Sequence, residues 1–230
     1  MSDYDAFAPI YDAWASDMTE DVAFYVDLAE EAEGPVVELA VGTGRVALPI
    51  AGQTGRKVIG IDSSPVMLAV ARERATEAGV ELELREGDMR ELALDEATDL
   101  VICPYRALLH LPTWKDRRQV FERVAAALRP GGRFAWNAFV FDPHVAVELD
   151  GKVYTIGEVG YRNAYFPHDN RIEIVLESGP SVGLWWVSRS EWEGLLDVAG
   201  LETEALYGWF DRRPFDEGSR EFVWVARKPS

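Results

Sequence analysis

The sequence predicts an α/β fold in which a mostly parallel sheet carries helices on both faces. Three observations support this class. Residues 36–62 follow the order strand, glycine turn, helix, strand and acid, and strand-like and helix-like segments then alternate as far as residue 139. Short strands separated by turns follow over residues 152–187. Alternating strands and helices build a parallel sheet covered on both sides, whereas successive short strands pair as antiparallel hairpins.

The segment at residues 36–62 is the strongest local signal. A short apolar run is followed by a tight turn at Gly42 and Gly44, by an apolar-periodic helix over about residues 45–53, and by a second apolar run that ends on Asp62. Glycine has no Cβ, so a ligand can lie against the backbone of such a turn. An acid at the end of the second strand can accept hydrogen bonds from both hydroxyls of a ribose. This βαβ unit therefore predicts a site for a nucleoside-bearing cofactor.

The other elements are placed by their caps and their apolar patterns. Thr19 is a good N-cap for a helix that runs to about residue 32. Ser64 and Pro65 begin a second helix, which ends near residue 78. In chain order, the further predictions are a strand at 80–86, a strand at 99–103, a helix at 114–128, a strand at 133–139, hairpin strands at 153–156, 159–166 and 171–177, a helix at 190–199, and strands at 201–207 and 221–226.

Aromatic residues are concentrated before the first predicted helix. Tyr4, Phe7, Tyr11 and Trp14 recur at spacings of three and four residues. That spacing is typical of the apolar face of a helix that docks on the body of a protein. A second interpretation, compatible with the first, is a lid whose tyrosine hydroxyls close over a cofactor.

Composition and charge exclude several classes of function. The 230 residues carry a formal net charge of −17, which argues against nucleic acid as a partner because its phosphates would be repelled. A small or cationic substrate suits this charge better. Cys103 is the only cysteine, and no His, Asp or Glu cluster has metal-ligand spacing, so we expect no disulfide and no metal. Without a signal peptide or a membrane-spanning run, we expect a cytoplasmic protein that does not contact a membrane.

Four landmarks in the right order resemble the class I S-adenosylmethionine-dependent methyltransferases. They are Glu-Leu-Ala-Val-Gly-Thr-Gly at 38–44, Gly-Ile-Asp-Ser-Ser at 60–64, Gly-Asp-Met at 87–89 and Leu-Arg-Pro-Gly-Gly-Arg at 128–133. The run from residue 207 to residue 216 resembles the last hairpin connection of small-molecule members. Together with the N-terminal run, it is similar to bacterial enzymes that methylate the amino group of nucleotide-linked sugars.

The resemblance implies a Rossmann-like sheet of seven strands, mostly parallel, with helices on both faces, an antiparallel last strand and a small antiparallel β insertion. It places residues 1–230 in a single methyltransferase domain. Within it, residues 1–33 form a helical lid, 34–140 the cofactor-binding core, 150–188 the β insertion, and 189–230 the end of the core. The implied activity is methyl transfer to a nitrogen or an oxygen of a small-molecule acceptor by in-line displacement.

The resemblance also implies roles for single residues toward S-adenosylmethionine. Glu38 would lie under the methionine amino group, Asp62 on the ribose hydroxyls, and Asp88 on the adenine amino group. Acids suit this cofactor, which carries a sulfonium and an ammonium but no phosphate. Arg45 would bind the methionine carboxylate or a phosphate, or point at solvent. The full set of implied cofactor-binding residues is Tyr11, Glu38, Ala40, Gly42, Gly44, Arg45, Asp62, Ser63, Met67, Asp88 and Met89.

The loop at residues 104–112, after the fourth strand, is expected to carry the catalytic residues. His110 is the best candidate for a base because an imidazole titrates near neutral pH, although it could equally be a structural histidine between two leucines. Tyr105 faces the same region or simply lines its wall. Arg106 either binds an acidic substrate group or ties the loop to a carboxylate on the body.

The resemblance implies that residues 152–187 decide which acceptor is used, because in similar small-molecule methyltransferases an insertion after the fifth strand either roofs the acceptor pocket or makes a homodimer contact. Two other functions stay open at this point. Gly42, Gly44 and Ala47 also satisfy a loose dinucleotide fingerprint, which would make the protein a nicotinamide-dependent oxidoreductase. A relative that binds the cofactor without catalysis would keep the same acids.

Overall fold

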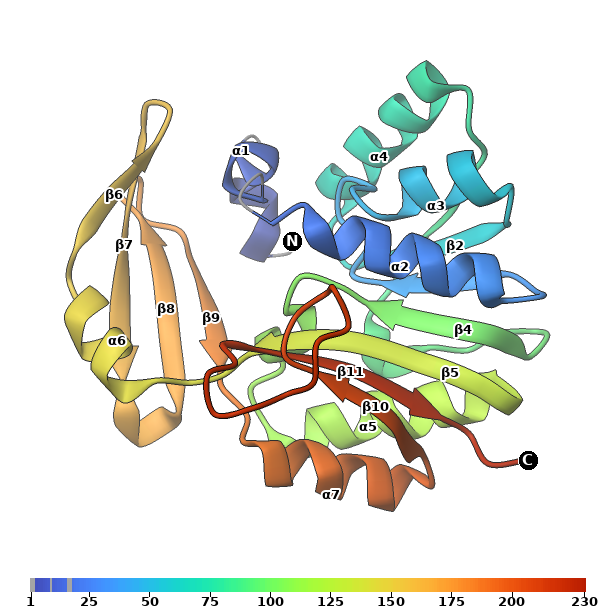
Figure 1. Ribbon diagram of the computed structural model, residues 1–230. Helices are drawn as coiled ribbons and strands as arrows, with labels where there is room; N and C mark the ends of the chain where they lie inside the picture. Colours follow the sequence, from blue (N-terminus) through green and yellow to red (C-terminus); the bar gives the residue numbers. More distant parts are fainter. Residues whose placement is uncertain (1–2, 9, 16–17) are drawn as a thin grey trace.

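The computed structural model describes residues 3–8, 10–15 and 18–230, and it contains two β-sheets (Figure 1). The larger sheet has seven strands in the order β10-β11-β5-β4-β1-β2-β3, and the smaller has four in the order β6-β7-β8-β9. The helical elements are η1 (Asp3–Ala6), α1 (Tyr11–Ala15), α2 (Glu20–Glu31), α3 (Ala47–Thr54), α4 (Pro65–Ala78), η2 (Met89–Glu91), η3 (Ala107–His110), α5 (Trp114–Ala127), α6 (Pro143–Leu149), η4 (Pro167–Asp169) and α7 (Arg189–Ala199). The strands are β1 (Val36–Leu39), β2 (Val58–Asp62), β3 (Glu83–Glu86), β4 (Thr98–Cys103), β5 (Leu128–Phe139), β6 (Val153–Ile156), β7 (Val159–Phe166), β8 (Arg171–Leu176), β9 (Ser181–Trp185), β10 (Glu202–Tyr207) and β11 (Glu221–Arg227).

The topology of the larger sheet confirms the predicted fold class. Strands β1 to β5 pair in parallel, whereas β11 runs antiparallel to both β5 and β10. Helices α2, α3 and α4 cover one face and α5 and α7 cover the other (Figure 1). Because parallel strands end at a common edge, the segments after β1, β2, β3 and β4 meet on one side of the sheet.

The helix boundaries follow from capping groups that the sequence supplies. The Ser64 hydroxyl accepts a hydrogen bond from the Met67 amide at the start of α4, and the Thr113 hydroxyl accepts one from the Asp116 amide at the start of α5. Thr19 precedes α2, as predicted, but its side chain makes no capping hydrogen bond. The acidic first turn of α2 therefore carries the favourable interaction with the helix dipole without help from Thr19.

Two apolar layers hold the helices to the sheet. On the α5 and α7 side, the Phe121 ring lies 5.1 Å from the Trp136 ring and 6.0 Å from the Trp192 ring, centroid to centroid, and all three side chains are fully buried. On the opposite side, residues such as Tyr25, Ile50 and Leu68 fill the space under α2, α3 and α4. The sheet between these layers is rigid enough to fix the loops at its edge.

The insertion forms the predicted antiparallel sheet, and it contains one more strand than the sequence indicated. Strand β9 pairs with β8 from Ser181 to Trp185, and α6 precedes the sheet. Neither element was predicted, because β9 contains a glycine and α6 is only a seven-residue helix. Phe7 packs on the inner face of this sheet against Ile174 and Leu176, so the N-terminal segment lies between the insertion and the core (Figure 1).

Strand β5 also differs from its prediction because it begins at Leu128, where the sequence indicated the end of a helix followed by a turn at 129–132 and a strand from residue 133. Leu128 pairs with Thr98, and the register shifts before Arg133 pairs with Leu100. Gly131 has φ +80° and donates its amide to the Lys228 carbonyl, so the expected turn is absorbed as an irregularity within the strand.

We expect Phe121→Ala to lower the free energy of unfolding by about 3–5 kcal/mol, because it leaves a cavity among buried aromatic rings. Denaturation in urea checks this value. Val198→Ala is the matched control: Val198 lies on α7 with 46% of its surface exposed, so its truncation should change stability by less than about 0.5 kcal/mol. Equal losses in the two variants would contradict the role given to this aromatic layer.

Candidate functional site

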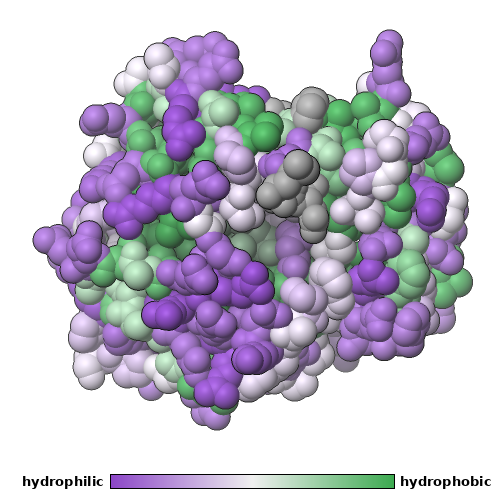
Figure 2. Space-filling model, turned by 180° about the vertical axis from the view of Figure 1, so that it is seen from behind, coloured by the Kyte–Doolittle hydropathy of each residue, from purple (hydrophilic) through white to green (hydrophobic). Residues whose placement is uncertain are grey.

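A cavity of about 550 Å³ lies at the edge of the sheet where β1, β2, β3 and β4 end. This volume is in the range of pockets that bind small molecules and cofactors. The outer surface is mostly hydrophilic, in keeping with the net charge, and it is hollowed near the middle of the face shown in Figure 2. The lining residues are Tyr4, Tyr11, Ala40, Gly42, Ile61, Asp62, Ser63, Met67, Gly87, Asp88, Met89, Arg90, Pro104, Tyr105, Ala107, His110, Leu111, Pro112, Val182, Gly183 and Trp185.

Asp62 organises the floor of the cavity. One carboxylate oxygen accepts the Gly42 amide at 2.8 Å and the other accepts the Ser64 amide at 2.8 Å. Burial raises the pKa of this carboxyl, and the backbone amides that it accepts oppose that shift. Gly42 has φ +55°, and a Cβ there would lie 3.7 Å from the Tyr11 ring, so the turn both needs glycine and supports the aromatic side chain above it. Asp62 therefore holds two turns in place and still lines the cavity.

Glu38 carries a buried carboxylate that is only partly satisfied. The side chain, on β1 just before the turn at Ala40–Gly42, is 2% exposed. Its Oε2 atom has no hydrogen-bond partner among residues 3–8, 10–15 and 18–230. Burial raises the pKa of Glu38 well above its ordinary value, although Arg45 nearby acts in the opposite direction. A buried acceptor in this state favours a ligand that brings a cationic N–H group.

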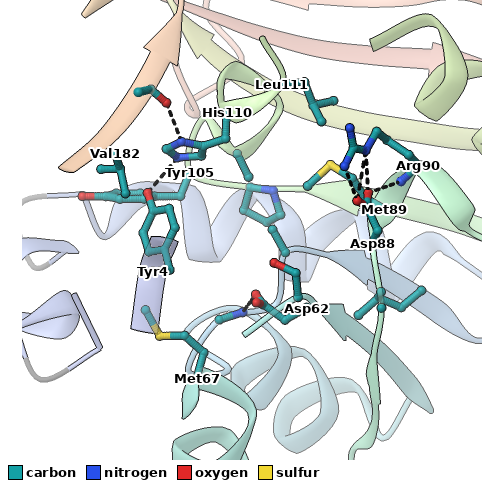
Figure 3. A pocket seen from close by; sticks show the side chains of 18 of the residues that line it. Tyr4, Asp62, Met67, Asp88, Met89, Arg90, Tyr105, His110, Leu111 and Val182 are labelled. Carbon is teal, nitrogen blue, oxygen red and sulfur yellow. Dashed lines mark hydrogen bonds and ion pairs between the residues drawn. The ribbon is translucent and has the colours of Figure 1, made fainter. Parts of the chain in front are cut away.

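At another end of the cavity, Asp88 is held by Arg90 (Figure 3). Asp88 caps η2 by accepting the Arg90 amide at 2.8 Å, and it also accepts hydrogen bonds from the Arg90 guanidinium. The guanidinium holds the pKa of Asp88 below its usual range. Asp88 is therefore a fixed, ionised acceptor at the cavity wall.

Tyr4, His110 and Gly183 join three distant segments over the cavity. His110 Nδ1 lies 2.8 Å from the Gly183 carbonyl oxygen, and His110 Nε2 lies 2.7 Å from the Tyr4 hydroxyl (Figure 3). A carbonyl only accepts, so Nδ1 carries the proton and Nε2 of the neutral ring accepts from Tyr4. The β insertion thus fixes the tautomer of His110 through its backbone.

The insertion also supplies part of the cavity wall. The Trp185 indole lies against Gly183: a Cβ at position 183 would be 2.6 Å from the ring, which is closer than side chains tolerate. The Arg171 guanidinium lies on the Trp185 ring at 5.8 Å from its centroid. The absence of a side chain at Gly183 is therefore what allows Trp185 to form this wall.

The two arginines that the sequence assigned to the site are both engaged by buried carboxylates and do not line the cavity. Arg45 makes a bidentate pair with Asp21 at 2.8 and 2.5 Å. Arg106 pairs with Glu221 at 2.7 Å. Of the two roles predicted for Arg106, the structure therefore supports the one in which it ties the loop to a carboxylate on the body of the protein. Tyr105 and Arg106 both have positive φ angles, a backbone strain of about 1–3 kcal/mol each, which the Arg106–Glu221 pair helps to hold.

Most predicted site residues do come together around the cavity. Those that line it are Tyr11, Ala40, Gly42, Asp62, Ser63, Met67, Asp88, Met89, Tyr105 and His110. Those that do not are Glu38, Gly44, Arg45 and Arg106. Sequence reasoning missed Arg90 and the contribution of β9. The Gly-Asp-Met run adjoins Arg90 and could have drawn attention to it, whereas the unpredicted strand gave no signal.

The described part of the chain contains neither a metal-binding cluster nor a membrane-spanning helix. Within residues 3–8, 10–15 and 18–230, no group of three or more His, Cys, Asp or Glu side chains is placed to hold a metal ion. In the same ranges, no helix has both the length and the apolar character needed to cross a bilayer.

Comparison with known proteins gives a consistent match. Residues 36–132 match the model of a methyltransferase domain family. The chain is 31% identical over 214 residues to the 27-O-demethylrifamycin SV methyltransferase of Amycolatopsis mediterranei, which covers 84% of this chain and 77% of that protein. It is 34% identical over 132 residues to the demethylmenaquinone methyltransferase of Thermus thermophilus, covering 56% of this chain. The match spans 58% of the length of the latter relative.

The fold is also similar to a solved structure. The crystal structure of a S-adenosylmethionine-dependent methyltransferase from Clostridium acetobutylicum superposes with a TM-score of 0.81 and covers 99% of both chains. The two sequences are 17% identical, so this likeness concerns the fold alone.

Glu38→Gln should stabilise the protein, and the gain should grow with pH. The folded state keeps the Glu38 proton at pH values where the unfolded chain, with a pKa of 4.5, has lost it. The free energy of unfolding of the natural protein therefore falls as pH rises through the raised pKa, and Gln removes this loss. Above that pKa we expect a gain on the order of 1–3 kcal/mol.

Urea denaturation at pH 5 and pH 8 measures this difference, with the exposed Glu202→Gln as control. If the Glu38→Gln variant is as stable as the natural protein at both pH values, the conclusion that Glu38 is a buried and partly unsatisfied carboxylate is wrong.

Proposed function

Since the chain belongs to the class I S-adenosylmethionine-dependent methyltransferases, we propose that it transfers a methyl group from S-adenosylmethionine to a nitrogen or an oxygen of a small molecule. The observation that carries the proposal is the partly unsatisfied buried carboxylate of Glu38, next to a cavity lined by Asp62 and Asp88. Two acids in the cavity wall and a third, Glu38, buried beside the turn at Ala40–Gly42 suit a ligand with an ammonium and a sulfonium and no phosphate. The nicotinamide-dependent alternative, whose cofactor carries a pyrophosphate, is set aside.

The residues present fit this cofactor. Glu38 Oε2 would accept from the ammonium of the methionine moiety, which supplies the donor that the oxygen lacks. Asp62 would accept from the ribose hydroxyls, because a carboxylate offers about four acceptor positions and the backbone amides of Gly42, Ser63 and Ser64 do not use all of them. Asp88 would accept from the adenine amino group, and Met67 and Met89 would pack on the ring.

The chemistry needs positioning and, for many acceptors, removal of a proton. When bound, S-adenosylmethionine supplies a methyl group made electrophilic by the positive sulfur. The Nε2 lone pair of His110 faces the Tyr4 hydroxyl, whose ring lines the cavity. A proton leaving the acceptor passes to the Tyr4 oxygen as Tyr4 gives its own proton to Nε2. Burial raises the pKa of Tyr4 well above its ordinary value, so the hydroxyl stays protonated and able to relay.

The choice of acceptor belongs to the wall that the insertion forms. Val182, Gly183 and Trp185 come from β9, outside the residues that would hold the cofactor. Because Arg45 and Arg106 are already paired with Asp21 and Glu221, neither brings an uncompensated positive charge for an anionic acceptor. This arrangement favours a neutral or cationic small molecule.

Isothermal titration calorimetry with S-adenosylhomocysteine, with NADH in a parallel titration, tests the function. We expect S-adenosylhomocysteine to bind at micromolar concentration or below and NADH to show no heat of binding. The reverse result would contradict the proposal. Formation of S-adenosylhomocysteine in a screen of amines and hydroxyl compounds then separates an enzyme from a relative that binds the cofactor without catalysis.

Asp62→Ala should weaken the binding of S-adenosylhomocysteine by about 1–3 kcal/mol, because the variant loses charge-assisted hydrogen bonds to the ligand. Calorimetry gives the affinity, and a thermal melt shows whether the variant is folded. The exposed Glu217→Ala serves as control for the lost charge. Unchanged affinity in Asp62→Ala would count against the whole assignment of the cofactor site.

His110→Asn should slow turnover about 100-fold or more while changing the affinity for S-adenosylhomocysteine less than about twofold. The Asn amide can replace the Nδ1 donor to Gly183, but it offers no base at the position of Nε2. Initial rates across pH with an acceptor from the screen measure the effect. Rates equal to those of the natural protein at every pH would make His110 a structural residue.

A further inference from the structure

The cavity has a charged end and an uncharged end. Among the described lining residues, the Asp, Glu, Lys and Arg side chains are those of Asp62, Asp88 and Arg90, which all come from the ends of β2 and β3 and the segments that follow them. The described lining residues from the loop after β4, from β9 and from the N-terminal segment include none of these four types. Figure 3 shows His110 and Val182 on one side of the cavity and Asp88 and Arg90 on the other.

Aromatic rings build the uncharged end. The Tyr4 ring lies 5.0 Å from the His110 ring and 6.2 Å from the Tyr11 ring, centroid to centroid. The Tyr11 ring in turn lies 6.0 Å from the Tyr105 ring, and all three pairs meet edge to face. The Trp185 indole lines the same cavity from β9. Because aromatic rings pack well on the faces and edges of other rings, such a wall favours a flat aromatic ligand.

Cations behind this wall are compensated by carboxylates of the protein. The Arg171 guanidinium lies against the Trp185 ring and pairs with Glu173. Arg45 pairs with Asp21, and neither arginine lines the cavity. A charged acceptor at this end would lose hydration without gaining an oppositely charged side chain from the residues that line it. A cationic acceptor would also be repelled by the sulfonium of the cofactor.

The proton relay favours an acidic hydroxyl as the reacting group. His110 is neutral, with Nδ1–H donated to Gly183, and it takes up one proton at Nε2 through Tyr4. An imidazolium has a pKa of about 6.5 and a phenol one of about 10, whereas an aliphatic hydroxyl is close to water at about 15.7. Transfer to His110 is therefore much less unfavourable from a phenol. Once formed, the imidazolium keeps an oxygen partner at each nitrogen, the Gly183 carbonyl and the Tyr4 oxygen.

We propose that the acceptor is a neutral aromatic molecule and that the methyl group is transferred to its phenolic hydroxyl. The inference rests on the proposed function, because it takes the uncharged end of the cavity to hold the acceptor. The hydroxyl oxygen forms a bond to the methyl carbon as the bond from that carbon to sulfur breaks and its electron pair stays on sulfur. The hydroxyl proton passes to the Tyr4 oxygen as the Tyr4 proton passes to His110 Nε2. The products are an aryl methyl ether and S-adenosylhomocysteine.

Binding of matched probes to the protein saturated with S-adenosylhomocysteine tests the choice of molecule. The probes are 2-naphthol, its saturated counterpart decahydro-2-naphthol, and 2-naphthylmethylamine, which is a cation at neutral pH. In calorimetry we expect 2-naphthol to bind about threefold or more tightly than either of the others, the effect of ring packing without a charge to desolvate. If 2-naphthol does not bind, or binds no better than either of the others, the proposal is overturned.

Turnover of the same probes with S-adenosylmethionine tests the reacting group. We expect kcat/KM for 2-naphthol to exceed the values for the other two probes about 100-fold or more. If the amine or the saturated alcohol is the better substrate, or if no probe is methylated, the proposal is overturned while binding of S-adenosylhomocysteine keeps the cofactor site. If S-adenosylhomocysteine does not bind, the proposed function fails first and this inference fails with it.

Two neighbouring tryptophans provide a variant and its matched control. Trp185→Leu removes a ring from the uncharged end, and we expect it to weaken the binding of 2-naphthol about threefold or more while changing the affinity for S-adenosylhomocysteine less than about twofold. Trp186 does not line the cavity and stacks on Phe141 with ring centroids 3.8 Å apart, so Trp186→Leu should keep the affinity of the natural protein for both ligands.

The comparison of these variants separates recognition of the acceptor from a general structural role. If Trp185→Leu and Trp186→Leu weaken 2-naphthol by the same factor, or if neither does, the aromatic wall does not select the acceptor and the proposal is overturned. A thermal melt of each variant confirms that the proteins compared are folded.

Discussion

The structure depends on one carboxylate, that of Asp62, which accepts the backbone amides of two turns at once. Gly42 belongs to the turn after β1 and Ser64 to the start of α4, and the sheet brings both within 2.8 Å of the same side chain. The acid thus fixes the backbone of the site before any ligand arrives. Because the turns are already in place, binding a ligand costs little further ordering of the chain.

Preorganisation here has a cost in stability, which Glu38 shows most clearly. Its buried carboxylate keeps one oxygen without a partner, and burial raises its pKa. By contrast, the arginines near the site are satisfied by Asp21 and Glu221. Among the described residues, Glu38 Oε2 is the one carboxylate oxygen in the set of buried side-chain atoms without a partner, whereas the charges of the nearby arginines are compensated within the fold. A buried acid in this state is characteristic of functional sites.

The fold and the floor of the site could be predicted from sequence because both arise from local patterns. The glycine turn, the acid at the end of β2 and the Gly-Asp-Met run all lie within short segments whose order fixes their place on a parallel sheet. What could not be predicted depends on contacts between distant segments: Tyr4 with His110, His110 with Gly183, and Arg106 with Glu221. Such pairs leave no periodic signal, and they decide whether a side chain faces the cavity or the body of the protein.

Because the wall at Gly183 and Trp185 comes from the inserted sheet, substitutions can reshape one end of the cavity independently of the other. A single methyl group at position 183 would displace the indole, since it would approach the ring to 2.6 Å. Asp62, at the end of β2, and Asp88, in the segment after β3, belong to the core domain and would not be disturbed. Small changes in β9 can therefore alter the space at one end of the cavity while leaving the end at Asp62 and Asp88 intact, which gives descendants of this chain a short mutational path to a differently shaped pocket.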